Sequence, residues 1–371
     1  MREPFFRDKK ILVIDQSPKT TNDRTWCFWE KETGLFEPVI DHRWNRLQFY
    51  SGRFSKELDI TPYQYKMIRG IDLYEFIKKE SAQFSNIEWR QETVKTVKTE
   101  NAIAIAVTDK NEYSADYVFN SIHFSNSQTS FLGAEEGGYH LLQHFKGWMI
   151  ETAEPAFDPS KATFMDFRVN QELGTTFFYV LPVSATAALV EYTLFTENLL
   201  PSDAYDAALQ AYIASRLQLG KYTITHEEFG MIPMTNFRFP LQEGHVVFTG
   251  IAGGQVKGSS GYAFRFIQKR TEEIVASLIQ TGSVSLMMSM NDKKFRLYDS
   301  VLLNVLSNHK MNGDEIFARI FRHNPPQRVL RFLDNESSLW EDLQIMRSVP
   351  ASIFLPAALQ ELTGKRSTFT Q

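Results

Sequence analysis

The chain has 371 residues, 43% of them hydrophobic and 23% charged, which is enough to bury a sizeable core in one large domain or two smaller ones. A net charge of −4 with interspersed signs gives no basic surface of the kind that binds nucleic acid. Cys27 is the only cysteine and no run approaches the roughly 20 apolar residues of a membrane span, so we expect no intramolecular disulfide and a cytosolic protein, soluble or peripheral to a membrane.

The N-terminal part is predicted to contain strands and one helix. Residues 11–15 indicate a short, fully buried strand that ends in Asp15. Residues 71–84 place Leu73, Phe76 and Ile77 on one helical face. Two further strands are expected at residues 103–107 and 117–119.

The middle of the chain is rich in strands. Strands are expected where β-branched and aromatic residues gather between turn residues, at 148–150, 163–169, 176–183 and 187–195. Ser202 is expected to cap a helix that carries Leu209, Tyr212 and Ile213 on one side. Residues 245–249 indicate another buried strand, and a helix is expected from Gly261 to about Leu278. The chain from Met290 onward is predicted to be mostly helical.

This order predicts an α/β fold whose first domain is discontinuous, because strands typical of dinucleotide binding lie on both sides of a β-rich insert. The expected divisions are 1–145 with 240–285, then 146–239 for the β-rich domain, and 286–371 for the helical region.

Two features indicate a nucleotide site. In a Rossmann-type unit the acid at the tip of the second strand accepts hydrogen bonds from the adenosine ribose, and Asp15 has this position. An ordinary strand that meets a turn would look the same. The stretch 250–262, GIAGGQVKGSSGY, follows a strand and precedes a helix, where glycines and free N–H groups suit anionic oxygens. A structural loop is the alternative, although it would need fewer glycines. The candidate cofactor residues in this stretch are Gly250, Ala252, Gly253, Gly254 and Gly261.

Six segments in order resemble the bacterial lycopene cyclases, over roughly residues 9–280. They are 22–30 (NDRTWCFWE), 165–168 (MDFR), 178–182 (FYVLP), 190–193 (VEYT), 230–234 (GMIPM) and 250–264. The resemblance implies a Rossmann-like FAD/NAD(P)-binding domain, of the aromatic-hydroxylase type of flavoprotein, with a β-rich substrate domain. It also implies an intramolecular lyase (isomerase) of carotenoid biosynthesis that turns the linear ends of lycopene into rings, most often of the beta-ionone type. Reduced FAD is the implied cofactor, NAD(P)H its reductant, and Arg24 is expected near the flavin.

Such a cyclisation needs an acid held in an apolar pocket, because burial keeps a carboxyl protonated and excluded water cannot trap the cation. The VEYT segment is similar to the motif that carries the family's catalytic glutamate, so the resemblance implies that Glu191 is this acid; the alternative is a solvent-facing strand position. Asp166 is the second candidate, with a structural ion pair to Arg168 as its alternative. Phe178, Tyr179, Tyr192 and Arg168 are expected to line the substrate pocket, although aromatic residues on strands are often simply core.

Other site chemistries find less support. The histidines lack metal-ligand spacing and no Gly-x-Ser-x-Gly elbow occurs, so neither a metal nor a covalent nucleophile is expected. A flavin monooxygenase or a prenyl-chain reductase is the main alternative, but the turn of such enzymes more typically begins Gly-Asp, and here Ile251 follows Gly250. A carotenoid- or lipid-binding protein without flavin is the second alternative.

Two expectations concern the surroundings of the chain. The substrate is insoluble in water, so we expect contact with a membrane surface, through residues 301–303 or 352–356. Only residues 1–8 precede the strand ending at Asp15, so the first strand and its Gly-x-Gly-x-x-Gly turn are expected to be missing from this chain and encoded just upstream. As given, the chain is then expected to be poorly soluble and free of flavin.

Overall fold

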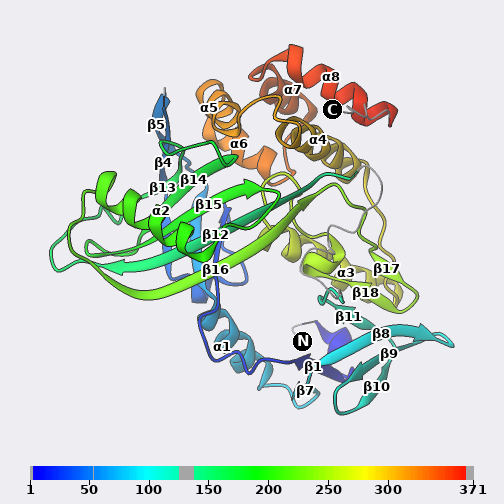
Figure 1. Cartoon of the computed structure of the whole chain (residues 1–371). Coiled ribbons are helices and arrows are strands. Elements are labelled where there is room, and N and C mark those ends of the chain that lie inside the picture. Colours follow the sequence, from blue (N-terminus) through cyan, green and yellow to red (C-terminus); the bar gives the residue numbers. More distant parts are fainter. Residues whose placement is uncertain (1–2, 53, 125–137, 365–371) are drawn as a thin grey trace.

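The computed structural model describes residues 3–52, 54–124 and 138–364, and the expectation about the N-terminus rests partly on Met1 and Arg2, which lie outside them. Within these ranges the largest sheet has seven strands in the order β16-β12-β15-β14-β13-β4-β5, and it crosses the middle of the molecule (Figure 1). Its strands are β4 (Arg46–Ser51), β5 (Phe54–Asp59), β12 (His140–Glu151), β13 (Lys161–Asp166), β14 (Thr175–Pro182), β15 (Ala187–Thr196) and β16 (Thr223–Thr235).

Four smaller sheets surround it in the described residues. One is antiparallel, with β6 (Gln64–Arg69) between β2 (Thr25–Glu30) and β3 (His42–Trp44). Two contain parallel pairs: β1 (Ile11–Asp15) with β7 (Ile87–Gln91), and β11 (Val118–Asn120) with β18 (Val246–Phe248), to which β17 (Gln242–Glu243) adds. The fourth is formed by β8 (Val94–Glu100), β9 (Ile103–Thr108) and β10 (Glu112–Ala115).

Helices cover these sheets and form the C-terminal part of the chain (Figure 1). The helices are α1 (Gly70–Ser81), α2 (Ser202–Ser215), α3 (Phe264–Thr281), α4 (Met290–Ser307), α5 (Gly313–His323), α6 (Pro326–Leu333), α7 (Leu339–Arg347) and α8 (Ala351–Thr363). Short 3-10 helices are η1 (Pro4–Phe6), η2 (Glu37–Val39) and η4 (Gly250–Gly253).

The two faces of the large sheet are buried in different cores, because successive side chains of a strand point to opposite faces. On one face Val190 and Tyr192 pack with Leu209 and Tyr212 of α2. On the other face the side chains join a larger core with the sheet of β2, β3 and β6 and with helices α4 to α8; its sheet members include Phe177, Tyr179 and Leu189.

A β-bulge in β13 changes which face its residues occupy. Thr163 pairs with Val180, but Asp166 pairs with Phe178, so β13 has one extra residue between these pairs. Phe164 and Met165 consequently both join the larger core, and Asp166 turns to the face that α2 covers.

Most of the predicted elements are confirmed, including the helical C-terminal region, but three details are wrong. The strand ending at Asp15 is only partly buried, since in the described residues β1 pairs with β7 alone. Ser202 is the first helical residue of α2 and Pro201 occupies the cap position, so no side-chain cap forms. Helix α3 begins at Phe264, because the φ of +70° at Gly261 belongs to a left-handed turn.

Candidate active site

Glu191 lies in a row of residues that crosses four strands of the large sheet. It pairs with Tyr179 of β14 on one side and with Gly147 of β12 on the other, and Gly147 pairs in turn with Glu228 of β16. Directly paired residues point to the same face, so the two glutamates share the face opposite α2. Sequence reasoning missed Glu228. Its signal was the Glu227-Glu228 pair on a strand, of which one residue must face inward.

Gly147 leaves the space between the two glutamates open. A Cβ atom there would lie 3.1 Å from Glu228 Cγ and 3.4 Å from Glu228 Oε1. The side chain of Glu228 therefore lies over the glycine, and so does that of Leu189, whose Cδ1 would also lie 3.1 Å from the added Cβ. Thr25 Oγ1 donates a hydrogen bond to Glu228 Oε2 at 2.7 Å, and Thr193 Oγ1 donates one to Glu191 Oε1 at 2.8 Å.

Both carboxyl groups are held toward their neutral forms. Burial, and then the charge of Glu228, raise the pKa of Glu191 from its ordinary 4.5 to about 8, against the lowering effect of the Thr193 hydrogen bond. Burial also raises the pKa of Glu228. Within the described part of the chain, neither carboxyl forms an ion pair with a lysine, arginine or histidine, which would have had the opposite effect. The site can therefore keep a proton on a carboxyl group near neutral pH.

Neutral aromatic side chains surround this face. Tyr179 Oη lies 3.2 Å from Tyr262 Oη, and burial raises the pKa of both phenols. The ring of Trp29 lies 4.7 Å from that of Tyr262, centroid to centroid. The remaining rings of this cluster are Phe164 and Tyr65, each in contact with others of the set.

Cys27 on β2 also belongs to this cluster. Burial and the charge of Glu191 raise the pKa of its thiol, so it stays neutral. The 22–30 segment thus alternates along β2: Thr25, Cys27 and Trp29 face the acid site, whereas the intervening side chains contact Phe264 of α3.

Asp166 is not brought to this site. It is fully buried, and Arg168 forms three hydrogen bonds with it, from the backbone N–H at 3.0 Å, from Nε at 2.9 Å and from an amino nitrogen at 2.7 Å. Tyr212 of α2 donates a fourth at 2.8 Å. Phe178 and Tyr192 share this face: their rings stack at 4.8 Å, and Phe178 stacks on Tyr212 at 3.9 Å. Of the predicted pocket residues, only Tyr179 lies beside Glu191.

The predicted glycine turn lies next to the same face of the sheet. Helix η4 supplies Gly250, Ala252 and Gly253, and Gly254 and Gly261 follow in left-handed conformations. A Cβ atom on Gly261 would overlap Oε1 of Gln143, a β12 residue that is 8% exposed. That oxygen and Ser260 Oγ are buried without a hydrogen-bond partner in the structure. A turn with close backbone approach and orphaned polar atoms fits the polar edge of a flavin nucleotide.

Asp15 and Arg24 lie close together at the end of β1, near helix α1. Arg24 pairs with Asp23 at 2.9 Å, and Tyr74 of α1 donates to Asp23 at 2.6 Å. Against the lowering effect of burial, the hydrogen bond with Asp23 raises the pKa of Arg24, and the charge of Asp15 adds a smaller effect. These residues and the glycine turn form two separate groups, one at each parallel strand pair. An extended dinucleotide is the kind of ligand that could contact both.

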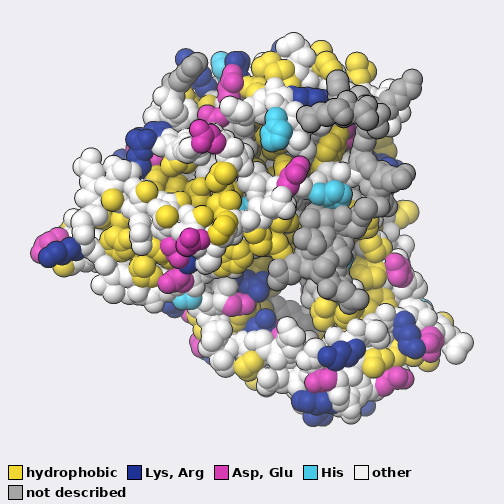
Figure 2. Space-filling view, in the orientation of Figure 1, with side chains coloured by type: hydrophobic (Ala, Val, Ile, Leu, Met, Phe, Trp, Pro, Cys, Tyr) yellow, Lys and Arg dark blue, Asp and Glu magenta, His cyan; other side chains and the backbone are white. Residues whose placement is uncertain are grey.

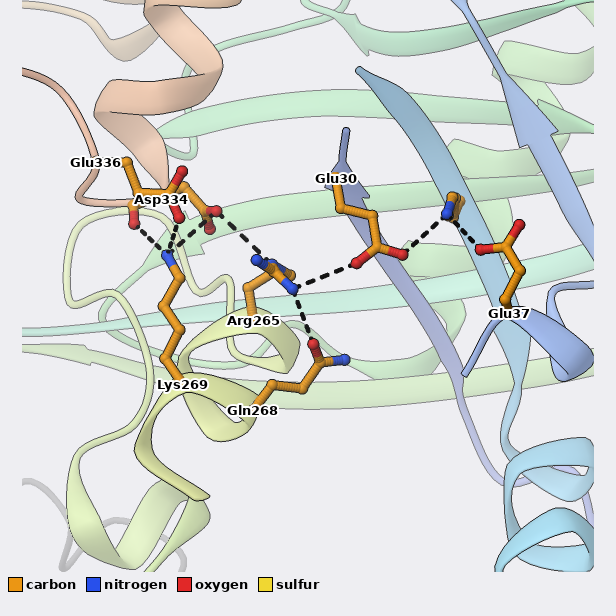
Figure 3. Close-up of polar contacts among 8 residues, drawn as sticks. Glu30, Glu37, Arg265, Gln268, Lys269, Asp334 and Glu336 are labelled. Atoms are coloured by element: carbon orange, nitrogen blue, oxygen red, sulfur yellow. Dashed lines mark hydrogen bonds and ion pairs between the residues drawn. The ribbon is translucent and has the colours of Figure 1, made fainter. Parts of the chain in front are cut away.

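A chain of ion pairs holds β2 against helix α3, which follows the glycine turn (Figure 3). Arg265 of α3 pairs with Glu30 of β2 at 3.3 Å, and Glu30 accepts from the buried Lys66 at 2.9 Å. At the other end, Lys269 pairs with Asp334 at 3.3 Å. The network fixes the strand that carries Thr25 and Cys27 relative to the turn that carries Tyr262.

The described ranges contain neither a metal-binding cluster nor a membrane-spanning helix. No group of three or more His, Cys, Asp or Glu side chains there is placed to hold a metal ion. No helix there combines the length and the apolar character needed to cross a bilayer.

Comparison with known proteins gives one family. A family model described as lycopene cyclase protein matches residues 7–358. The lycopene beta-cyclase of Pantoea ananas is 26% identical over 274 residues, which is 69% of this chain and 64% of that protein. The chain therefore spans less than two thirds of the length of this curated relative.

The fold is that of FAD-dependent flavoproteins. A geranylgeranyl bacteriochlorophyll reductase-like protein of Thermoplasma acidophilum has a TM-score of 0.56 at 12% identity, covering 96% of this chain and 92% of that one. The flavin-dependent brominase Bmp2 has a TM-score of 0.59 at 11% identity, covering 97% of this chain and 95% of that one. Klebsiella pneumoniae HpxO, complexed with FAD and uric acid, has a TM-score of 0.56 at 12% identity, covering 90% of this chain and 97% of that one. At these identities the likeness concerns the fold alone.

Proposed function

The chain belongs to the lycopene cyclase protein family. We propose that it closes the linear ends of lycopene into beta-ionone rings by a proton-initiated isomerisation. The observation that carries the proposal is Glu191, a carboxyl whose pKa is raised to about 8, set among neutral aromatic rings. A proton donor that is still protonated at neutral pH is what the first step of such a cyclisation requires.

In the proposed reaction Glu191 gives its proton to the terminal double bond of the polyene. The cation that forms is attacked by a neighbouring double bond, which closes the six-membered ring. A proton then leaves an adjacent carbon and returns to the carboxylate, so atoms and electrons balance and no net oxidation occurs. The rings of Trp29, Phe164 and Tyr179 offer faces that attract the cation, and their burial excludes water.

We propose that reduced FAD is held between the Asp15–Arg24 group and the glycine turn, with NAD(P)H as its reductant. When bound, reduced FAD would supply negative charge near the cation. Tyr262 comes directly after the turn and contacts Tyr179, so the same segment would join the cofactor to the acid site.

We further propose that the enzyme is cytoplasmic and takes its hydrocarbon substrate from a membrane surface. Of the two segments expected to make this contact, 301–303 is mostly buried, with Val301 and Leu303 in the core. Segment 352–356 lies on α8, where Ile353 and Phe354 pack against the core and Leu355 is exposed. Exposed apolar side chains gather on α8 and on the neighbouring helix α7, at the top of the molecule (Figures 1 and 2). They are Leu339, Trp340, Leu343 and Met346 on α7 and Leu355, Leu359 and Leu362 on α8. Arg347 lies 5.9 Å from the ring of Trp340, a combination that suits a headgroup layer.

The test is to express the chain in a host that accumulates lycopene, and to assay the purified protein with lycopene in liposomes, FAD and NAD(P)H. The expected product is a cyclic isomer with the mass of lycopene, formed without stoichiometric oxidation of NAD(P)H. One NAD(P)H consumed per product, with a change of mass, would support the reductase or monooxygenase alternative instead. Bound carotenoid without any product would support the binding-protein alternative.

A further inference from the structure

Glu228 stands out among the buried groups that the proposed reaction does not use. Its side chain is 5% exposed and its only hydrogen bond in the described structure comes from Thr25. The adjacent Glu227 points to the other face, is 54% exposed and pairs with Lys146 at 3.2 Å. One glutamate of the pair is thus an ordinary surface ion, and the other is enclosed with no cation beside it.

Glu228 lies two strands away from Glu191, on the same face of the sheet. Residues two strands apart are separated by roughly 10 Å between Cα atoms, which glutamate side chains can span from both ends. The Gly147 position between them is crossed by the Glu228 side chain, whose Oε1 would lie 3.4 Å from a Cβ there. Two carboxyl groups that lie on either side of a glycine, on the same face of the sheet and largely shielded from solvent, cannot both ionise without strong repulsion; the charge of Glu228 accordingly raises the pKa of Glu191.

We propose that Glu228 is a positioning residue that shares a single proton with Glu191 and so keeps the proton donor loaded. This inference rests on the proposed function, in which Glu191 donates that proton. Before the reaction one carboxyl of the pair is neutral and the other ionised. After donation both are ionised, and their repulsion favours recapture of the proton that leaves the ring.

The other groups that face the pair do not replace this function. They are Tyr179 of β14, Tyr262 after the glycine turn, Cys27 of β2, Tyr65 of β6 and Asp23 before β2. The phenols and the thiol stay neutral, because burial raises the pKa of each. Asp23 pairs with Arg24, so its charge is largely balanced. Glu228 is therefore the group whose ionisation most directly opposes that of Glu191.

The experiment compares the pH profile of kcat for the wild type, Glu228→Gln and the matched control Glu227→Gln, with purified full-length chain and lycopene in liposomes. Removing the charge at position 228 is expected to move the alkaline limb about one pH unit lower. Activity at pH 8 then falls about fivefold and activity at pH 9 about ninefold, while activity at pH 6 stays within about twofold. Glu227→Gln should keep the wild-type limb. If Glu228→Gln does not fold, Glu228→Asp should move the limb in the same direction by less.

An unmoved limb, or an equal loss of activity at every pH, would overturn the inference, since a merely structural role for Glu228 predicts the latter. A second readout needs no turnover: an infrared pH titration of protonated carboxyl groups. The wild type should show a protonated carboxyl at pH 7 that is absent in Glu191→Gln and titrates at lower pH in Glu228→Gln. If the wild type forms no cyclic product, the proposed function fails, and the infrared titration alone decides whether the pair shares a proton.

Discussion

Replacing Glu191 with glutamine tests the acid site most directly. The substitution keeps the size of the side chain, and its amide oxygen can still accept the hydrogen bond from Thr193. It removes the transferable proton and the negative charge. We therefore expect a folded protein that retains its flavin and has lost at least a hundredfold in ring closure, about the low end of what a general acid contributes.

The same substitution should change stability in a direction fixed by the pKa. Between pH 4.5 and about 8 the folded protein holds a proton on Glu191 that the unfolded chain has released, so wild-type stability falls as pH rises through this window. Since one pKa unit corresponds to about 1.4 kcal/mol, an ionised Glu191 is expected to cost the folded protein a few kcal/mol above pH 8. Part of this cost comes from repulsion by the charge of Glu228. We therefore expect Glu191→Gln to raise the free energy of unfolding by a few kcal/mol at pH 9 and by little at pH 4.5.

Two measurements check this reasoning. Carotenoid analysis of the lycopene-accumulating host reports ring closure, and chemical denaturation at pH 4.5 and pH 9 reports the two free energies of unfolding. Wild-type amounts of cyclic carotenoid from Glu191→Gln would refute the assignment of the donor. A stability difference between the two proteins that does not change with pH would refute the buried, neutral state of the carboxyl.

Three further predictions concern other parts of the molecule. Asp166→Asn is expected to lower the free energy of unfolding by about 2 kcal/mol, because it weakens the pairing with a partly exposed Arg168. The activity per folded molecule should stay unchanged. A variant with full stability but lost activity would show that Asp166 takes part in the reaction. Gly261→Ala is expected to reduce the amount of bound flavin, measured by absorbance. The control Gly282→Ala should retain the flavin, because Gly282 has the same φ of about +70° but no atom within 4 Å of an added Cβ. Equal flavin in both variants would show that the turn is not part of the cofactor site. The double variant Leu343→Asp, Leu359→Asp should no longer co-sediment with liposomes. The control Leu35→Asp, at a similarly exposed leucine elsewhere, should still co-sediment. Unchanged co-sedimentation of the double variant would exclude α7 and α8 as the membrane contact.

Much of this protein is determined locally and could be read from the sequence. Apolar runs and their periodicity located eight of the 18 strands in the described residues, helix α1 and the helical C-terminal part, because these patterns record which side of an element is buried. The period of two also implies that Phe178 and Tyr179 point to opposite faces, as they do. The order of the six motifs indicated the family, which the family model confirms.

The composition of the acid site was decided by tertiary structure. Glu191 and Glu228 are brought together by pairing of β15 and β16 with β12, and strand order and register depend on contacts between distant segments. Asp166 lies outside the acid site because of the bulge in β13. Regular alternation would place Phe164 and Asp166 on one face, whereas the extra residue lets Phe164 and Met165 fill the same core and turns Asp166 toward Arg168 and Tyr212. Packing of the whole sheet, which no single segment encodes, therefore determined which carboxyl group shares the face of Glu191.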